Sequence, residues 1–97
     1  MTEGPRLTVR DNPAESRFEA VDESGALAAV SVYVRHDDRV VFVHTEVDDA
    51  FEGQGVGSLL VRQALDTVRG EGLRVVAQCP FVKAWIERHP EYADLTH

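Results

Sequence analysis

The sequence of 97 residues contains a single cysteine, Cys79, and no long apolar run. One cysteine rules out an internal disulfide and a zinc site built from several cysteines. No segment approaches the roughly 20 apolar residues of a membrane-spanning helix, and the first ten residues lack the apolar stretch of a secretion signal. We therefore expect a cytoplasmic protein with one domain, residues 1–97, because a second core would leave neither half enough buried surface.

Basic residues are also scarce: the sequence has ten Lys and Arg residues and 17 Asp and Glu residues, which gives a net charge of −7. All of the excess negative charge falls in residues 1–52, because residues 53–97 carry equal numbers of acidic and basic side chains. Binding to a phosphate backbone needs a basic stripe that this sequence does not have, so we expect no nucleic-acid partner. The acidic half suits a cationic partner, although a solvated surface that aids solubility would explain the same charge.

The first half of the sequence alternates apolar and polar residues with the period of a β-strand. This alternation predicts strands at residues 7–10, 17–21, 27–35 and 40–47. Turn residues between them are Asp11-Asn12-Pro13, Glu23-Ser24-Gly25 and His36-Asp37-Asp38.

After Gly57 the apolar period changes to 3.6 residues, which predicts an amphipathic helix that ends at Gly70. A further strand is predicted at 73–79 and a short helix at 81–89, begun by Pro80, with Trp85 and Ile86 in the core. A helix that joins two strands in this way makes them parallel neighbours, so the strand ending at Val47 should pair with the one starting at Leu73.

The segment from Glu52 to Ser58 follows a strand, opens the long helix and contains three glycines. Glycines let a ligand approach the backbone, and the free N–H groups of a helix N-terminus attract phosphate oxygens. The segment is neither a dinucleotide-binding fingerprint, which needs glycine at Ser58, nor a P-loop, which needs Gly-Lys-Ser or Gly-Lys-Thr. From spacing alone, an anion cradle and a simple turn before a helix both remain open.

Residues 44–92 resemble the small, single-domain branch of the GNAT N-acetyltransferase superfamily. The similarity lies in His-Thr-Glu-Val before the loop, Gly55-Val56-Gly57 within it and Cys-Pro-Phe after the next strand. Glu52 stands where the superfamily usually has Gln or Arg. The resemblance implies an α/β (α+β) fold with a mixed sheet of about five strands and two helices, lacking the usual N-terminal helices. It also implies acetyl-CoA as cosubstrate, no metal, and transfer of an acetyl group to a primary amine.

In such a fold acetyl-CoA would lie in a V-shaped gap between Thr45–Val47 and Ala77–Cys79. The pantetheine would pair with the backbone near Glu46 and Val47, and an N–H near Val47 would polarise the acetyl carbonyl. The residues that the resemblance assigns to the coenzyme are Val47, Gly53, Gln54, Gly55, Val56, Gly57 and Ser58.

Three side chains are candidates for catalysis: Cys79, His44 and Glu46. Cys79 could be a nucleophile or the acid that protonates the leaving thiolate, or simply a small buried residue. His44 and Glu46 lie two apart on one strand and share a face, where His44 could activate the thiol and either residue could act as base. A structural role is the alternative for each. The tyrosine acid of many superfamily members is not evident, because Tyr92 comes late.

The missing N-terminal helices would leave the acceptor site open. An open site beside an acidic half favours an exposed cationic amine, such as a peptide, a protein or a polyamine. We expect no membrane partner, and a monomer or weak dimer. A coenzyme A binding or partner-regulating module without catalysis is the alternative function, since it would carry the same glycine loop.

Overall fold

The computed structural model describes residues 6–96. His97 lies outside the described residues, and so do residues 1–5, which belong to the N-terminal segment examined above for a secretion signal. The strands are β1 (Thr8–Asn12), β2 (Arg17–Val21), β3 (Leu27–Arg35), β4 (Arg39–Val47) and β5 (Arg74–Ala77). The helices are α1 (Val56–Gly70) and α2 (Pro80–Arg88), with short 3₁₀ segments η1 (Pro13–Glu15), η2 (Asp49–Phe51) and η3 (Pro90–Thr96).

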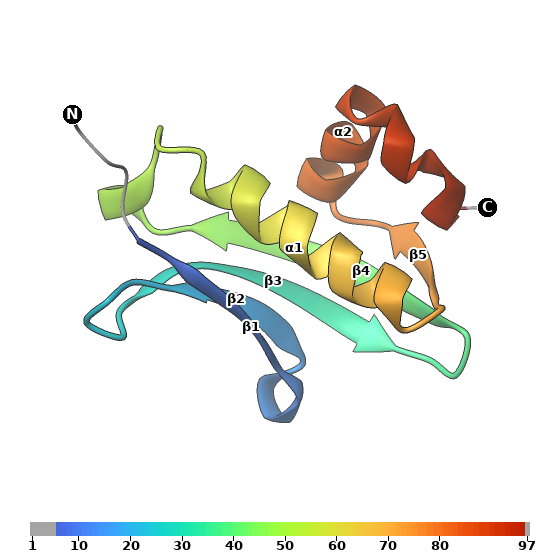
Figure 1. The fold of residues 1–97 in the computed structure, drawn as a ribbon, viewed down its shortest axis with the longest axis horizontal. Helices are drawn as coiled ribbons and strands as arrows, with labels where there is room; N and C mark the ends of the chain where they lie inside the picture. Colours follow the sequence, from blue (N-terminus) through green and yellow to red (C-terminus); the bar gives the residue numbers. More distant parts are fainter. Residues whose placement is uncertain (1–5, 97) are drawn as a thin grey trace.

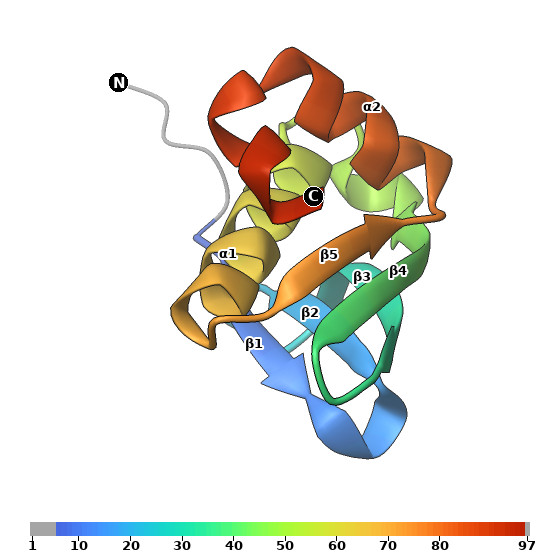
Figure 2. The same cartoon turned by 90° about the vertical axis from the view of Figure 1, so that its right-hand side faces the viewer.

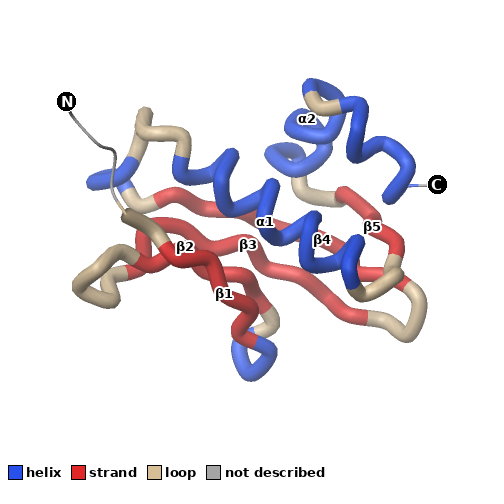
Figure 3. The backbone as a smooth tube through the Cα atoms, viewed as in Figure 1, coloured by secondary structure: helices blue, strands red, loops and turns tan. Residues whose placement is uncertain are grey.

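The five strands form one sheet in the order β1-β2-β3-β4-β5. Neighbours from β1 to β4 are antiparallel, whereas β5 is parallel to β4 and is reached through α1. The predicted parallel pair is therefore confirmed. Figures 1 and 3 show α1 lying along one face of the sheet. Among the described residues, no α-helix covers the opposite face.

The core lies between this sheet face and α1. The apolar stripe of α1 is buried, as its 3.6-residue period predicts, and packs on side chains of β2, β3 and β4. Phe18, Tyr33 and Phe42 form an aromatic cluster on the sheet, with centroid separations of 5.4 to 6.4 Å. Trp85 and Ile86 of α2 are buried, as predicted. In β3 the core takes Ala29, Ser31 and Tyr33, while the alternating valines face the open side of the sheet.

Two element ends and one additional segment differ from the sequence prediction by more than one residue. β1 continues through the predicted turn, because Asp11 and Asn12 pair with Phe18 and Arg17. β5 ends at Ala77 instead of Cys79, and Cys79 becomes the residue that precedes α2. The C-terminal 3₁₀ segment η3 was not predicted; it packs against β5 and α2.

A β-bulge interrupts β4 near its middle. Val32 of β3 faces His44, but the next residue, Tyr33, faces Phe42, so Val43 has no opposite residue. An extra residue of this kind bends its strand and increases the local twist. The bulge immediately precedes the part of β4 that leaves β5.

Candidate active site

A gap opens between β4 and the chain that follows β5. The two strands pair only from Arg39 opposite Arg74 to Phe42 opposite Ala77. The amides of Gln78 and Cys79 then both donate to the carbonyl oxygen of Phe42, at 3.0 and 2.8 Å. Beyond this point β4 continues to Val47 while α2 carries the chain away from the sheet, as Figure 2 shows. Backbone pairing thus ends at Phe42, and the rest of β4, up to Val47, has no strand paired to it on this edge.

The edge of β4 that faces this gap has free backbone groups. On the other edge, the amide of Asp48 donates to the carbonyl of Ala28 at 2.8 Å. Successive residues of a strand direct their N–H and C=O groups to opposite edges. The N–H groups of Val47 and Thr45 therefore point into the gap, where an extended ligand could pair with them.

The glycine loop lies at the mouth of the gap. Gly53 and Gly55 have φ values of 77° and 76°, the left-handed region that favours glycine, and Gly55 caps α1. The first hydrogen bond of α1 runs from the amide of Leu59 to Gly55 at 3.0 Å. The amides of the preceding turn, residues 56–58, accordingly have no partner within the helix. They lie at the positive end of the helix dipole, which suits an anionic group.

Gly57 brings three elements into close contact. A Cβ at this position would lie 2.6 Å from Cζ of Phe81 in α2 and 3.2 Å from Cγ2 of Val47 in β4. The side-chain oxygen of the next residue, Ser58, accepts a hydrogen bond of 2.8 Å from Nε1 of Trp85. Glycine at 57 therefore lets the start of α1 approach both walls of the gap.

Cys79 lies on the core side of β4. Its side chain is buried, and Sγ donates to Oγ1 of Thr45 at 3.4 Å. Thr45 Oγ1 is in turn 3.0 Å from Oγ of Ser31, which lies opposite it on β3. Sequence reasoning missed both hydroxyl residues, although Thr45 alternates with two residues that it did select.

His44 and Glu46 lie on the other face of β4, the one that α1 leaves open. Nε2 of His44 is 3.1 Å from Oε1 of Glu46, so the predicted shared face is correct. Both side chains are exposed. In this structure the thiol of Cys79 hydrogen-bonds Thr45, whereas His44 pairs with Glu46, so no direct contact supports the hypothesis that His44 activates Cys79.

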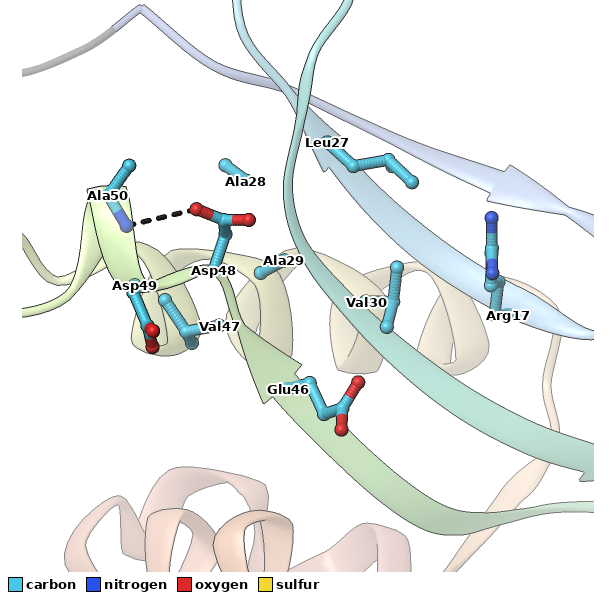
Figure 4. Close-up of a pocket in the computed structure, with 10 residues that line it drawn as sticks. All are labelled: Arg17, Leu27, Ala28, Ala29, Val30, Glu46, Val47, Asp48, Asp49 and Ala50. Atoms are coloured by element: carbon cyan, nitrogen blue, oxygen red, sulfur yellow. Dashed lines mark hydrogen bonds between the residues drawn. The ribbon is translucent and has the colours of Figure 1, made fainter.

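A groove of about 800 Å³ adjoins Glu46, at the ends of β3 and β4. Figure 4 views it from the face that α1 does not cover. Its carboxylates are those of Glu46, Asp48 and Asp49, and apolar side chains of β3 complete it. The groove also contains Arg17, whose Nε is 2.7 Å from the carboxylate of the neighbouring Glu19. The charge left for a ligand is thus mainly negative.

Tyr92 lies in η3, and its side chain makes a structural contact with α1. Its hydroxyl donates to the carboxylate of Asp66 in α1 at 2.7 Å. This hydrogen bond, together with burial, raises the pKa of Tyr92 above its ordinary value. The other tyrosine, Tyr33, donates to Asp11 at 2.6 Å, at the far end of β3. Neither tyrosine hydroxyl is therefore placed at the gap.

Within residues 6–96, no helix is long and apolar enough to cross a membrane. The same residues include no group of three or more His, Cys, Asp and Glu side chains that could hold a metal ion.

Residues 17–95 match the family model described as GCN5-related N-acetyl-transferase. Since the match covers most of the sequence and the fold and gap agree with it, the chain belongs to this family. The resemblance inferred from the sequence is confirmed.

Particular relatives are Protein NATD1 of cattle (Bos taurus), 36% identical over 63 residues, and Protein NATD1 of Homo sapiens, 35% identical over 63 residues. Each alignment covers 64% of this chain and 56% of the relative, so the chain spans just over half the length of these proteins. An NMR structure of a GCN5-like protein from Staphylococcus aureus has a TM-score of 0.69 and 31% identity, covering 94% of this chain and 88% of that one. Ard1 from Thermoplasma volcanium has a TM-score of 0.54 and 25% identity, covering 68% and 45%.

Proposed function

We propose that this protein is an acetyl-CoA-dependent N-acetyltransferase that acts on a primary amine. The observation that carries the proposal is that the unpaired end of β4 and the glycine-rich N-terminus of α1 lie next to each other. The pairing of β4 with β5 ends at Phe42, and the N-terminus of α1, with its glycines and unpaired amides, packs beside the unpaired end of β4 at Val47. A Cβ built on Gly53 or Gly55 would meet nothing within 4 Å, so the loop is open to a ligand. These residues fit the coenzyme.

The backbone supplies most of the binding in this proposal. The amides of residues 53–58 hold the pyrophosphate without any basic side chain. The free edge of β4 near Glu46 and Val47 pairs with the pantetheine like an added strand. The N–H of Val47, which points into the gap, donates to the acetyl oxygen and stabilises the charge that develops there.

In this proposal the two proton transfers take place on opposite faces of β4. Acetyl-CoA supplies a thioester whose carbonyl carbon can be attacked by an amine. On the open face, Glu46 accepts the proton of the incoming ammonium group, and His44, 3.1 Å away, holds the carboxylate in place. On the core face, Cys79 holds a proton at Sγ beside the gap and can donate it to the leaving sulfur. A nucleophilic role for Cys79 makes a different prediction, tested below.

The acceptor in this proposal is an amine that carries a second positive charge, such as a polyamine or a lysine-containing peptide. The groove beside Glu46 supports this choice, since Asp48 and Asp49 add negative charge at its rim. We also infer a reducing compartment such as the cytoplasm, because Cys79 must stay a free thiol.

Calorimetric titration with acetyl-CoA and with free coenzyme A tests the binding step. Gly57→Ala should weaken binding at least tenfold, because its Cβ would push on Phe81 and Val47 at the gap. Gly70→Ala is the matched control, since it adds the same atom in open space at the other end of α1. Failure of the unmodified protein to bind either ligand would refute the proposal.

Turnover and intact mass then separate an enzyme from a passive binding module. With binding intact, Cys79→Ala should reduce acetyl transfer, and Glu46→Gln should reduce it most at low pH, where free amine is scarce. A stable gain of one acetyl mass, lost in Cys79→Ala, would assign Cys79 as the nucleophile. Binding without turnover on any amine would support the module instead.

Two amines of equal length test the acceptor class. Cadaverine and pentylamine differ by one positive charge, and we expect cadaverine to have the higher kcat/KM. Asp49→Asn should narrow this difference, whereas Asp37→Asn, an equal charge change in the distant turn after β3, should not. Equal kcat/KM values for the two amines would contradict a cationic acceptor.

A further inference from the structure

A chain of three side chains runs from the sheet to the start of α2. Ser31 on β3 and Thr45 on β4 are opposite each other, with their hydroxyl oxygens 3.0 Å apart. Cys79, the residue before α2, completes the chain with Sγ 3.4 Å from Oγ1 of Thr45. Ser31 and Cys79 are 1% and 2% exposed, and Thr45 between them is partly exposed, so the two ends of the chain are shielded from bulk water.

The chain can be hydrogen-bonded in either direction. A hydroxyl has one hydrogen and two lone pairs, and a thiol is a weak donor and acceptor. While Cys79 holds its proton, Sγ–H donates to Thr45, whose own hydroxyl can donate to Ser31. Once that proton has left, Thr45 can rotate to donate to Sγ while Ser31 donates to Thr45. The second arrangement stabilises a thiolate with a charge-assisted hydrogen bond.

We propose that Thr45, supported by Ser31, is the positioning residue for Cys79: it fixes the thiol at the gap and stabilises the thiolate by reversing its hydroxyl. The use of this device in turnover rests on the proposed acetyltransferase function. The effect on the thiol itself does not, because the chain of contacts is complete in the free protein.

Other groups around Cys79 are placed less directly. His44 and Glu46 belong to the opposite face of β4 and pair with each other. Lys83, one turn into α2, donates its amide to the carbonyl of Cys79 at 3.0 Å, but its side chain lines a separate cavity with Glu87. Within the described part of the chain, Thr45 is the side chain that hydrogen-bonds Sγ. The N-terminus of α2 adds a favourable dipole that every variant below retains.

Ultraviolet absorbance of the thiolate against pH, in the free protein, tests the proposal. Cys79 is the only cysteine, so Cys79→Ser supplies the blank. Burial and Asp11 raise the pKa of Tyr33, and Asp66 and burial raise that of Tyr92, so both tyrosines ionise above their ordinary value of 10.0. Subtraction of the Cys79→Ser blank, which contains both tyrosines, removes their contribution at high pH.

Thr45→Val keeps the shape but removes the hydroxyl, and we expect roughly tenfold less thiolate at a given pH. Thr45→Ser should restore the midpoint, because it restores the donor. Ser31→Ala should shift the midpoint in the same direction by a smaller amount, and it supplies the test if Thr45→Val does not fold. With turnover established, Thr45→Val should lower kcat with an unchanged KM for acetyl-CoA.

An unmoved thiolate midpoint in a folded Thr45→Val protein, or an equal shift in Thr45→Ser, would overturn the proposal. A purely structural role would lower stability without moving the midpoint. Failure of the protein to bind acetyl-CoA would refute the proposed function but leave this titration valid, so the two failures are distinguishable.

Discussion

Glu19 is a buried carboxylate on the open face of the sheet, and its charge should make stability depend on pH. Its side chain is 1% exposed. Oε1 accepts a hydrogen bond from Arg10 at 2.8 Å, and Oε2 accepts bonds from Arg17 at 2.7 Å and Asn12 at 3.0 Å. Burial alone favours the neutral acid, but the donors of Arg17, Arg10 and Asn12 outweigh it and lower the pKa of Glu19 from 4.5 to about 2.

A lowered native pKa means that the unfolded state binds more protons in this range. The stabilisation is therefore complete above pH 4.5 and is lost as the pH falls from 4.5 to about 2. At about 1.4 kcal/mol per pKa unit the difference corresponds to about 3 kcal/mol. Because Arg10 is 56% exposed, solvent screens part of this interaction, and we expect about 2 kcal/mol.

Urea unfolding of the wild-type protein and of Glu19→Gln, at neutral pH and near pH 2, measures this contribution. The variant keeps the shape of the side chain and removes its charge. Its deficit in unfolding free energy should be about 2 kcal/mol at neutral pH and should nearly vanish near pH 2. Glu15→Gln, at an exposed position in η1, is the control for general acid effects. An equal deficit at both pH values would refute the reasoning, because shape and not charge would then be responsible.

Three other substitutions have expected outcomes. Gly57→Ala should destabilise the protein by about 1 kcal/mol, because the added Cβ would lie 2.6 Å from the ring of Phe81. The destabilisation should be much smaller in a Phe81→Ala background, and a double-mutant cycle of urea unfolding measures this coupling. Trp85→Phe should cost about 2 kcal/mol in the same assay, since it leaves the Ser58 hydroxyl without its 2.8 Å donor and reduces core packing. Tyr92→Phe should cost about 1 kcal/mol through its lost hydrogen bond to α1 and leave acetyl transfer unchanged; a collapse of turnover would make Tyr92 the missing acid.

Local periodicity was sufficient to predict most of the fold. The strands at 17–21 and 27–35 and the helix ending at Gly70 match the structure, because in each of them the core-facing side chains recur with the period of the element. The early end of β5 and the η3 segment were not predictable in this way. They depend on how Phe42 binds two successive amides and on packing between distant segments, which no local pattern encodes.

The candidate site was predicted in its parts but not in its connections. The glycine loop, the lone thiol and the pair of His44 and Glu46 could be found from residue type and spacing. The contact between Cys79 and Thr45 could not be found in this way. The residues of β4 after Phe42 do not pair with β5, so no strand register places Thr45 relative to Cys79; that position depends on how α2 packs against the sheet. Sequence reasoning therefore chose His44 as the partner of the thiol.

The bulge at Val43 explains both the gap and the assignment of residues to its two sides. Phe42 faces the core, so unbroken alternation would also direct His44 and Glu46 to the core. The extra residue reverses the alternation, and the core side receives Thr45 instead. The same insertion bends β4 where its pairing with β5 ends. One additional residue thus separates the strands, puts the hydroxyl beside the thiol and leaves the carboxylate facing the acidic groove. In the proposed mechanism, this arrangement lets Glu46 act as the base towards the amine and Cys79 as the acid towards the thioester without competing for one proton.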